Sequence, residues 1–172
     1  MSHVTRTFML LVFLVLPLIV LSVVGHPAHA ICVADGAAGV LECFTTAYAQ
    51  RDIEAFSQLL ASDFVFVSIG PLRQMDQDRA AELETIGRIF ASPAVESMSL
   101  SFDPAFDVVP GGEPGTWKLD NLKATLSLRA TASGQAGPKD YSVTVRMSLY
   151  VRQVASPTPH FEVFREEDYQ PE

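Results

Sequence analysis

Few side chains in this 172-residue sequence are of the types that carry out chemistry on a substrate. His160 is the only histidine after residue 30, and no His or Cys residues cluster at the spacing of metal ligands. Asp103 and Asp107, on either side of Pro104, could form a carboxylate pair, but both are also common turn residues. With no nucleophile elbow or phosphate-binding loop, the sequence predicts no catalytic residue, no metal and no cofactor.

Four polar or aromatic side chains are candidates for contact with a bound molecule. Tyr48 falls on the apolar face of a predicted helix, where its hydroxyl can reach a pocket or simply complete a core. Ser68 lies near a strand end, where it can meet a ligand or cap the backbone. Arg146 would anchor a carboxylate if its strand face lined a cavity, although the alternation around Met147 favours a solvated arginine. Trp117 begins a strand, where it covers a pocket mouth or packs in the core.

Two helices are expected to position the first of these residues. Residues 38–50 repeat apolar side chains at helical spacing, which defines one buried face. The members of that face are Leu41, Phe44, Ala47 and Tyr48. Asp52 follows, and its carboxylate can accept hydrogen bonds from the free amides of a new helical turn, so it is the predicted N-cap of a second helix. That helix is expected to end at residues 62–63.

A covered strand and a third helix are predicted next. Residues 64–69 are apolar on both faces, as in a strand that is covered on both sides, and Phe66 is expected to point inward. Gly70 and Pro71 end this strand. The third helix spans residues 77–90 and begins at an aspartate cap, either Asp76 or Asp78.

The remainder of the sequence alternates apolar and polar residues with a period of two, as strands do. Such runs occupy residues 95–103, 117–130, 141–152 and 160–165. The alternation of apolar, inward-facing residues shifts by one position near residues 120–121, which predicts a β-bulge and a bent strand. The acidic run that follows the last strand, Glu166 to Asp168, is expected to close the domain.

This order of elements predicts an α+β fold in which three helices pack on a curved, mostly antiparallel sheet. We expect one domain over residues 31–168 and a frayed tail at 169–172. A sheet curved in this way encloses a cavity between its concave face and the helices.

Short segments at both ends of the predicted domain resemble the nuclear transport factor 2-like superfamily. Residues 48–56 read YAQRDIEAF and residues 60–64 read LASDF, similar to the first helical hairpin of these proteins. Residues 161–168 read FEVFREED, similar to their final strand. The superfamily includes SnoaL-like polyketide cyclases, ketosteroid isomerases and scytalone dehydratase. The resemblance implies a cone-shaped fold with an apolar pocket, which Phe44 and Phe66 would line.

The resemblance does not carry over the known catalytic groups. With Asp52 as the anchor, Phe44 stands where the isomerases have the phenol of their oxyanion hole, and Ser68 stands where they have the proton-abstracting aspartate. A phenyl ring donates no hydrogen bond and an ordinary serine is no carboxylate base, so ketosteroid isomerase chemistry is disfavoured. Dehydratase chemistry would need a histidine and an aspartate in the pocket, and His160 is expected at the start of a strand.

Residues 1–30 have the pattern of a secretory signal peptide. Arg6 precedes an uncharged apolar run, and the run is followed by Ala28, His29 and Ala30, a small-x-small cleavage site. We therefore expect an exported protein, periplasmic or secreted; the alternative is an uncleaved N-terminal helix that anchors the domain. Ile31 precedes Cys32 where a lipoprotein signal requires a small residue, which disfavours lipidation.

Cys32 and Cys43 are the only two cysteines. In an exported protein such a pair can form a disulfide, here between the N-terminal arm and the first helix. The alternative is two thiols that never meet, because spacing alone does not establish the geometry.

The charge of the expected mature domain limits its partners. Removal of residues 1–30 takes away one of the 12 Lys and Arg residues and none of the 20 Asp and Glu residues, which leaves a net charge of −9. This balance argues against nucleic acid and against anionic membrane surfaces as partners. We expect a domain that holds a small apolar ligand or forms a homodimer through its sheet.

The alternative is a pocket enzyme, an isomerase, cyclase or dehydratase that acts on a hydrophobic substrate. A third possibility is a sheet-mediated partner of another secreted protein, without a ligand. An open cavity that contains a buried Asp or Glu with a raised pKa would favour the enzyme.

Overall fold

A computed structural model of the chain describes residues 32, 34, 36–69, 76–131, 137–155 and 159–169. The expected signal peptide, residues 1–30, lies outside the described residues, as does the break expected at Gly70 and Pro71. No helix within the described ranges has the length and apolar character needed to cross a membrane.

The three predicted helices are present, and an aspartate caps two of them. They are α2 (Gly39–Gln50), α3 (Ile53–Leu59) and α4 (Arg79–Phe90). An oxygen of Asp52 accepts hydrogen bonds at 3.0 Å from the backbone N–H groups of Glu54 and Ala55. Asp78 accepts one at 2.9 Å from Ala81 at the start of α4. These bonds satisfy amides that have no partner within the helix itself.

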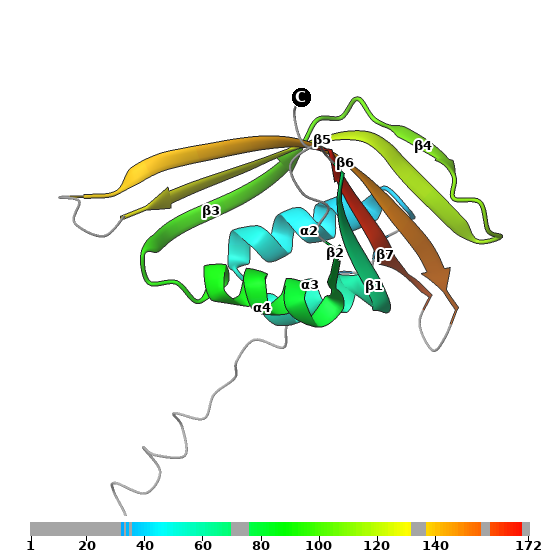
Figure 1. The fold of residues 1–172 in the computed structure, drawn as a ribbon, viewed down its shortest axis with the longest axis horizontal. Coiled ribbons are helices and arrows are strands. Elements are labelled where there is room, and N and C mark those ends of the chain that lie inside the picture. Colours follow the sequence, from blue (N-terminus) through cyan, green and yellow to red (C-terminus); the bar gives the residue numbers. More distant parts are fainter. Residues whose placement is uncertain are drawn as a thin grey trace, which may run out of the picture. The chain divides into compact units, whose positions relative to one another are not determined.

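Seven strands form a single sheet, and the helices lie together on one side of it (Figure 1). The strands are β1 (Leu60–Ile69), β2 (Asp76–Asp78), β3 (Val95–Phe102), β4 (Asp107–Pro110), β5 (Thr116–Ala130), β6 (Lys139–Val154) and β7 (His160–Tyr169). Their order is β2-β1-β7-β6-β5-β3, and β4 also pairs with β5. Only the β1–β7 pair is parallel among the pairs of the described strands. The expected α+β class, with helices on a curved, mostly antiparallel sheet, is confirmed.

The bulge predicted on β5 is present. The register with β6 shifts between Leu119 and Leu122, and Asn121 adopts a left-handed conformation with φ of 57°. Asparagine tolerates this conformation better than most residues, which explains why the extra residue sits here. The bulge keeps apolar side chains on the concave face along both halves of a 15-residue strand.

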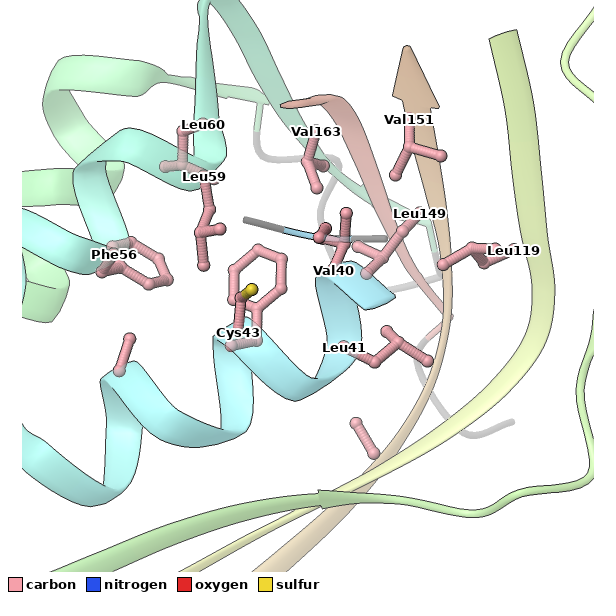
Figure 2. Close-up of a cluster of buried hydrophobic side chains, with 14 of the residues drawn as sticks. Val40, Leu41, Cys43, Phe56, Leu59, Leu60, Leu119, Leu149, Val151 and Val163 are labelled. Carbon is pink, nitrogen blue, oxygen red and sulfur yellow. The ribbon is translucent and has the colours of Figure 1, made fainter. Parts of the chain in front are cut away.

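The hydrophobic core occupies the space between the first half of α2 and the sheet (Figure 2). Val40 of α2 and Leu119, Val151 and Val163 of three strands have no exposed surface. Full burial of such a side chain contributes about 1.5–3 kcal/mol. Towards the start of β6, from Leu149 back to Val143, the concave face is not filled in this way, and a cavity lies there.

Two boundaries differ from those expected. The second helix ends at Leu59, not at residues 62–63, and Leu60 already has an extended backbone. The guanidinium of Arg79 donates to the carbonyl oxygens of Ser57 and Leu60 at this end, at 2.7 and 3.2 Å. The chain then enters β1 four residues before the predicted strand. The short strands β2 and β4 were not predicted, since three- and four-residue strands carry no clear period.

The last strand is longer than expected. It does not end at Arg165; β7 continues through residues 166–168 to Tyr169. It pairs with β1 on one side and β6 on the other, and these long-range hydrogen bonds hold an acidic run in the sheet. Local polarity gave no sign of this pairing.

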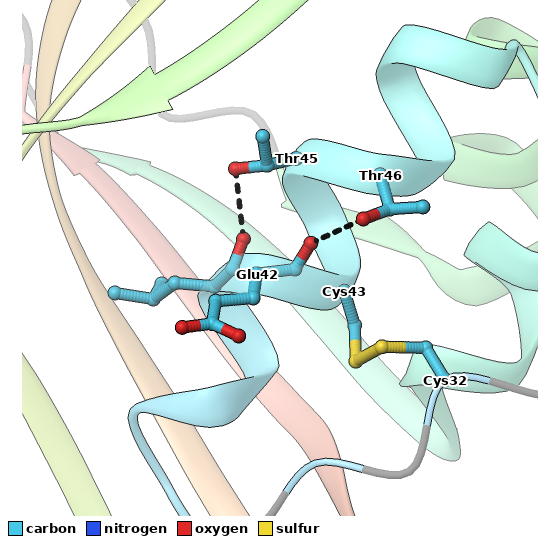
Figure 3. Close-up of a disulfide and its surroundings, with 6 residues drawn as sticks. Cys32, Glu42, Cys43, Thr45 and Thr46 are labelled. Carbon is cyan, nitrogen blue, oxygen red and sulfur yellow. Dashed lines mark hydrogen bonds between the residues drawn. A yellow bond between two sulfur atoms is a disulfide. The ribbon is translucent and has the colours of Figure 1, made fainter.

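Cys32 and Cys43 form a disulfide between the segment that precedes α2 and the middle of that helix (Figure 3). Their Cα atoms are 5.5 Å apart, within the usual range. Cys43 is buried against the core, so the bridge fixes the N-terminal arm to the most tightly packed part of the domain. Thr45 and Thr46, on the same helix, donate to the backbone oxygens of Leu41 and Glu42.

Candidate functional site

A partly open cavity of about 430 Å³ lies between the helices and the concave face of the sheet. Strands β3, β5 and β6 supply its apolar wall with side chains at alternate positions. These are Leu100, Phe102, Ala124, Leu126, Val143, Val145, Met147 and Leu149. The alternation follows from the pleat of the sheet, and the bulge on β5 preserves it. The wall can therefore cover an apolar molecule without offering it a hydrogen bond.

Aromatic rings form the helical side of the cavity. Phe44 packs edge-to-face on Phe56 with ring centroids 5.6 Å apart, and Tyr48 packs in the same way on Phe56 and Phe90 at 5.7 and 5.3 Å. Pairs of this geometry stabilise beyond the area that they bury, by about 0.5–1.5 kcal/mol each. The cluster gives the cavity a rigid wall opposite the sheet.

Three carboxyl groups also line the cavity, and they come from two elements: Glu166 and Asp168 of β7 and Glu82 of α4. Glu166 stands in register between Phe66 of β1 and Leu149 of β6. Asp168 stands one step farther, between Ser68 and Met147. Because alternate residues of a strand share a face, both acids point to the concave side.

These carboxyl groups have unusual protonation properties. Burial, with the nearby charges of Asp168 and Glu82, raises the pKa of Glu166 well above its ordinary value. Burial raises the pKa of Asp168 to about 6, and burial with the charge of Asp168 raises the pKa of Glu82 to about 6. Asp168 and Glu82 therefore lose their protons across the pH range around 6, and burial favours the neutral form of Glu166.

The hydrogen-bonding state of the acids is equally unusual. The Oδ1 atom of Asp168 is buried and has no hydrogen-bond partner. Within the described residues, the side chains of Glu166 and Glu82 form no hydrogen bond and no ion pair. An unsatisfied buried acceptor costs about 1–3 kcal/mol, and a ligand with a donor would recover that free energy.

Tyr48 lies close enough to the acids to respond to them. Burial raises the pKa of its hydroxyl, and the charges of Glu166, Glu82 and Asp168 raise it further. The hydroxyl consequently remains protonated and is a hydrogen-bond donor at the helical side of the cavity.

The sequence-predicted residues divide into two groups in the structure. Phe44, Tyr48, Phe66 and Ser68 line the cavity together. Trp117 lies outside its lining and packs on Phe161 with ring centroids 5.4 Å apart, because it belongs to the part of β5 that covers the core.

Arg146 also lies outside the cavity. Since Met147 faces the cavity, its neighbour Arg146 must face the other side of the sheet, where it is exposed in register with Lys123 and Tyr169. The solvated alternative described for this arginine is the one that the structure shows.

The sequence did not predict that acidic side chains line the cavity, and the reason is a second β-bulge, which lies on β7. Tyr150 pairs with Arg165 and Val151 pairs with Val163, so Phe164 is an extra residue on β7. Without it, strict alternation from Val163 would send Arg165 inward and Glu166 outward. The only signal in the sequence was three acids directly after a strand pattern.

Metal binding is not indicated at this site. Within the part of the chain that the structure describes, no group of three or more His, Cys, Asp or Glu side chains is arranged to hold a metal ion. The arrangement can instead hold a hydrogen-bond donor, or exchange a proton with a molecule in the cavity.

The sequence matches no protein-family model and no curated protein. Solved structures do match the fold. A nuclear transport factor 2-like superfamily protein from Salmonella enterica serovar Typhimurium is 12% identical, with a TM-score of 0.58 over 77% of this chain and 87% of that one. A nuclear transport factor 2-like protein from Rhodospirillum rubrum is 16% identical, with a TM-score of 0.55 over 80% of this chain and 100% of that one.

A third similar structure, from Novosphingobium aromaticivorans, is provisionally named a scytalone dehydratase. It is 12% identical, with a TM-score of 0.54 over 75% of this chain and 77% of that one. Likeness at these identities establishes architecture and not a reaction, since one fold hosts many functions. The described domain has the cone-shaped α+β fold of the nuclear transport factor 2-like superfamily.

Proposed function

We propose that this domain binds a small, largely apolar molecule in the cavity between its helices and its sheet. The observation that carries the proposal is the cavity of about 430 Å³, walled by aliphatic and aromatic side chains and unfilled by the core. Ligand sites in proteins have volumes of roughly 300–1,000 Å³ and combine apolar walls with a few polar groups. The carboxyl groups of Glu82, Glu166 and Asp168 are the polar groups here.

Binding can be tested with N-phenylnaphthylamine, an uncharged aromatic fluorophore. We expect a saturable rise in its fluorescence on titration with the protein. Leu126→Trp, which fills the cavity, should abolish the rise. Thr125→Trp is the matched control, because the adjacent residue of β5 points to the other face, where its hydroxyl meets Thr144 at 2.9 Å. Equal binding by the two variants would contradict the proposal.

A second candidate function is acid–base catalysis on a hydrophobic substrate, as in an isomerase, cyclase or dehydratase. Asp168 supports it, because a carboxyl group with a pKa of about 6 and a free buried oxygen suits a general base near neutral pH. Glu166 complements it, because burial raises the pKa of its carboxyl group and so favours the protonated form, which can donate a proton.

Proton transfer in the cavity can be measured without knowledge of the substrate. We expect the protein to accelerate deuterium exchange from D₂O into tetralone, an aromatic ketone with acidic C–H bonds, and Asp168→Asn to abolish the acceleration. Mass spectrometry of the recovered ketone gives the rate. Binding of tetralone without any exchange would remove this second candidate and leave the first in place.

We also propose that the protein is exported and works in an oxidising compartment. The signal-peptide pattern of residues 1–30 and the Cys32–Cys43 disulfide support this proposal, because disulfides persist where thiols are not kept reduced. Cell fractionation of the organism, with mass determination of the protein in each fraction, tests it. A cytosolic protein that retains residues 1–30 would contradict it.

A further inference from the structure

The cavity is acidic at one place and apolar elsewhere. Its acidic side chains are Glu82, Glu166 and Asp168, and none of the described residues that line it is a lysine, arginine or histidine. Ser68, Gln77 and Thr85 are its other polar side chains besides Tyr48. The charges of these acids act on one another across the same cavity, so the acids form one polar zone against the aromatic and aliphatic walls.

In the polar zone, the Oδ1 atom of Asp168 and the carboxyl group of Glu166 have no hydrogen-bond donor as a partner within the part of the chain that the structure describes. Asp168 Oδ1 is buried and unpartnered, and the side chain of Glu166 makes no hydrogen bond or ion pair with any described residue. On the opposite face of the same strand, by contrast, Glu167 has three partners: Arg165 at 2.7 Å and the hydroxyls of Tyr150 and Tyr169 at 3.2 Å. The fold can therefore pair a carboxylate on β7, and on the cavity side it does not.

From this arrangement we propose that the ligand is a cationic amphiphile, an organic amine whose ammonium group meets Asp168 and Glu166 and whose apolar body lies against the walls. The inference rests on the proposed function, that the cavity binds an apolar molecule, and adds the chemical class of the ligand. An ammonium group offers up to three donors, enough to satisfy Asp168 and a second carboxylate together.

Other ligand classes fit the cavity less well. A carboxylate or phosphate ligand would add negative charge to a zone that already holds three acids. A neutral alcohol offers one donor and leaves the remaining acceptors unsatisfied. Aromatic rings line the cavity at Phe44, Tyr48 and Phe66, and a cation gains free energy where it meets the face of such a ring.

Amine binding should be coupled to the protonation of the acids. The titratable groups that face the polar zone are Tyr48 from α2, Glu82 from α4, and Glu166 and Asp168 from β7. A bound cation favours ionised carboxylates, so it lowers their pKa values and releases protons. Affinity for an amine should therefore rise as the pH increases through about 6, whereas affinity for a neutral ligand should change much less.

Three ligands that share a naphthyl group but differ in charge separate the contribution of charge to affinity from that of apolar contact. They are naphthylmethylamine, naphthylmethanol and naphthoate. Isothermal titration calorimetry of the full mature domain measures each affinity. We expect the amine to bind at least about tenfold more tightly than the alcohol, and naphthoate to bind most weakly. In buffers with different ionisation enthalpies, the observed enthalpy should reveal proton release for the amine alone.

Substitutions test whether the acids of the polar zone cause the preference for the amine. In the double variant Glu166→Gln with Asp168→Asn, the amine should lose its advantage while the alcohol binds within about twofold of its original affinity. Glu84→Gln removes a charge from the exposed side of α4 and should retain the amine preference. Circular dichroism confirms that each variant is folded before titration.

The outcomes distinguish the inference from the function on which it rests. If the alcohol binds as tightly as the amine, or if the double variant retains the preference, the proposed ligand class is wrong and the apolar binding function stands. If none of the three ligands binds, both are wrong.

Discussion

Glu166 and Glu167 are consecutive on β7, yet they occupy opposite electrostatic environments. Glu167 lies on the convex face, where Arg165 and two tyrosine hydroxyls satisfy its carboxylate. Glu166 lies on the concave face in the cavity, and burial raises its pKa well above the ordinary value. Phe164 is the extra residue of the β-bulge in β7, and this bulge determines which of the two acids points into the cavity.

This contrast predicts stability changes of opposite sign for two chemically identical substitutions. Glu167→Gln removes a paired charge and should lower the free energy of unfolding, by about 1 kcal/mol or more. Glu166→Gln removes a group that favours its neutral form, so at about pH 8 it should leave the free energy of unfolding unchanged or raise it. Urea denaturation measures both. Equal destabilisation by the two substitutions would mean that Glu166 has an undetected stabilising partner.

Asp168→Asn should stabilise the protein in a pH-dependent manner. The folded-state pKa of about 6 exceeds the ordinary value of 3.8, so the folded state holds this proton more tightly than the unfolded state does. The associated stability is present below about pH 4 and is lost as the pH rises through about 6. Asparagine cannot ionise and avoids the loss, which is on the order of 3 kcal/mol.

The measurement is urea denaturation of the wild type and of Asp168→Asn from about pH 4 to about pH 8. The difference in the free energy of unfolding should be small at the acidic end and grow in favour of the variant towards neutral pH. Glu84→Gln, on the exposed side of α4, is the control and should follow the wild type. A difference that stays constant with pH would place Asp168 in a solvated environment.

The cap of α3 is predicted to matter for the helical hairpin that walls the cavity. Asp52→Ala removes the acceptor of the Glu54 and Ala55 amides and should cost about 1 kcal/mol. Asp52→Asn keeps an acceptor oxygen and should cost less than half of that. Thermal denaturation of both variants provides the comparison, and equal losses would show that the charge of Asp52, not its capping, stabilises the domain.

The disulfide should contribute measurably to stability. Its cysteines are 11 residues apart in sequence, and a bridge over a short loop stabilises by about 2–3 kcal/mol, chiefly by restricting the unfolded chain. The variant with Cys32→Ala and Cys43→Ala should have a correspondingly lower melting temperature. A reducing agent should lower the melting temperature of the wild type and leave that of the variant unchanged; sensitivity of the variant would point to a different cause.

The sequence sufficed for the architecture because local patterns determine most of it. The apolar stripe of residues 38–50, the cap at Asp52 and the strand alternation with a bulge at residues 120–121 all appear in the structure. The solved structures with the same fold confirm the resemblance that rested on short segments such as residues 48–56.

The residues that line the cavity could be predicted only in part from the sequence. Phe44, Tyr48, Phe66 and Ser68 lie in its wall because their patterns extend over whole elements. Its acids depend on the register of β7 between β1 and β6, which hydrogen bonds between distant segments determine. A bulge that adds one residue to a strand moves every later side chain of that strand to the opposite face of the sheet. No sequence pattern near Phe164 indicates that β7 has such a bulge.

The most direct test of the account is NMR titration of the side-chain carboxyl carbons of Asp168 and Glu166. We expect Asp168 to titrate with a pKa of about 6 and Glu166 to titrate with a pKa above its ordinary range. The assignments come from Asp168→Asn and Glu166→Gln, each of which removes one signal. Titration of both groups near about 4, as for solvated carboxyl groups, would contradict the desolvated acidic zone on which the proposed ligand chemistry and proton transfer depend.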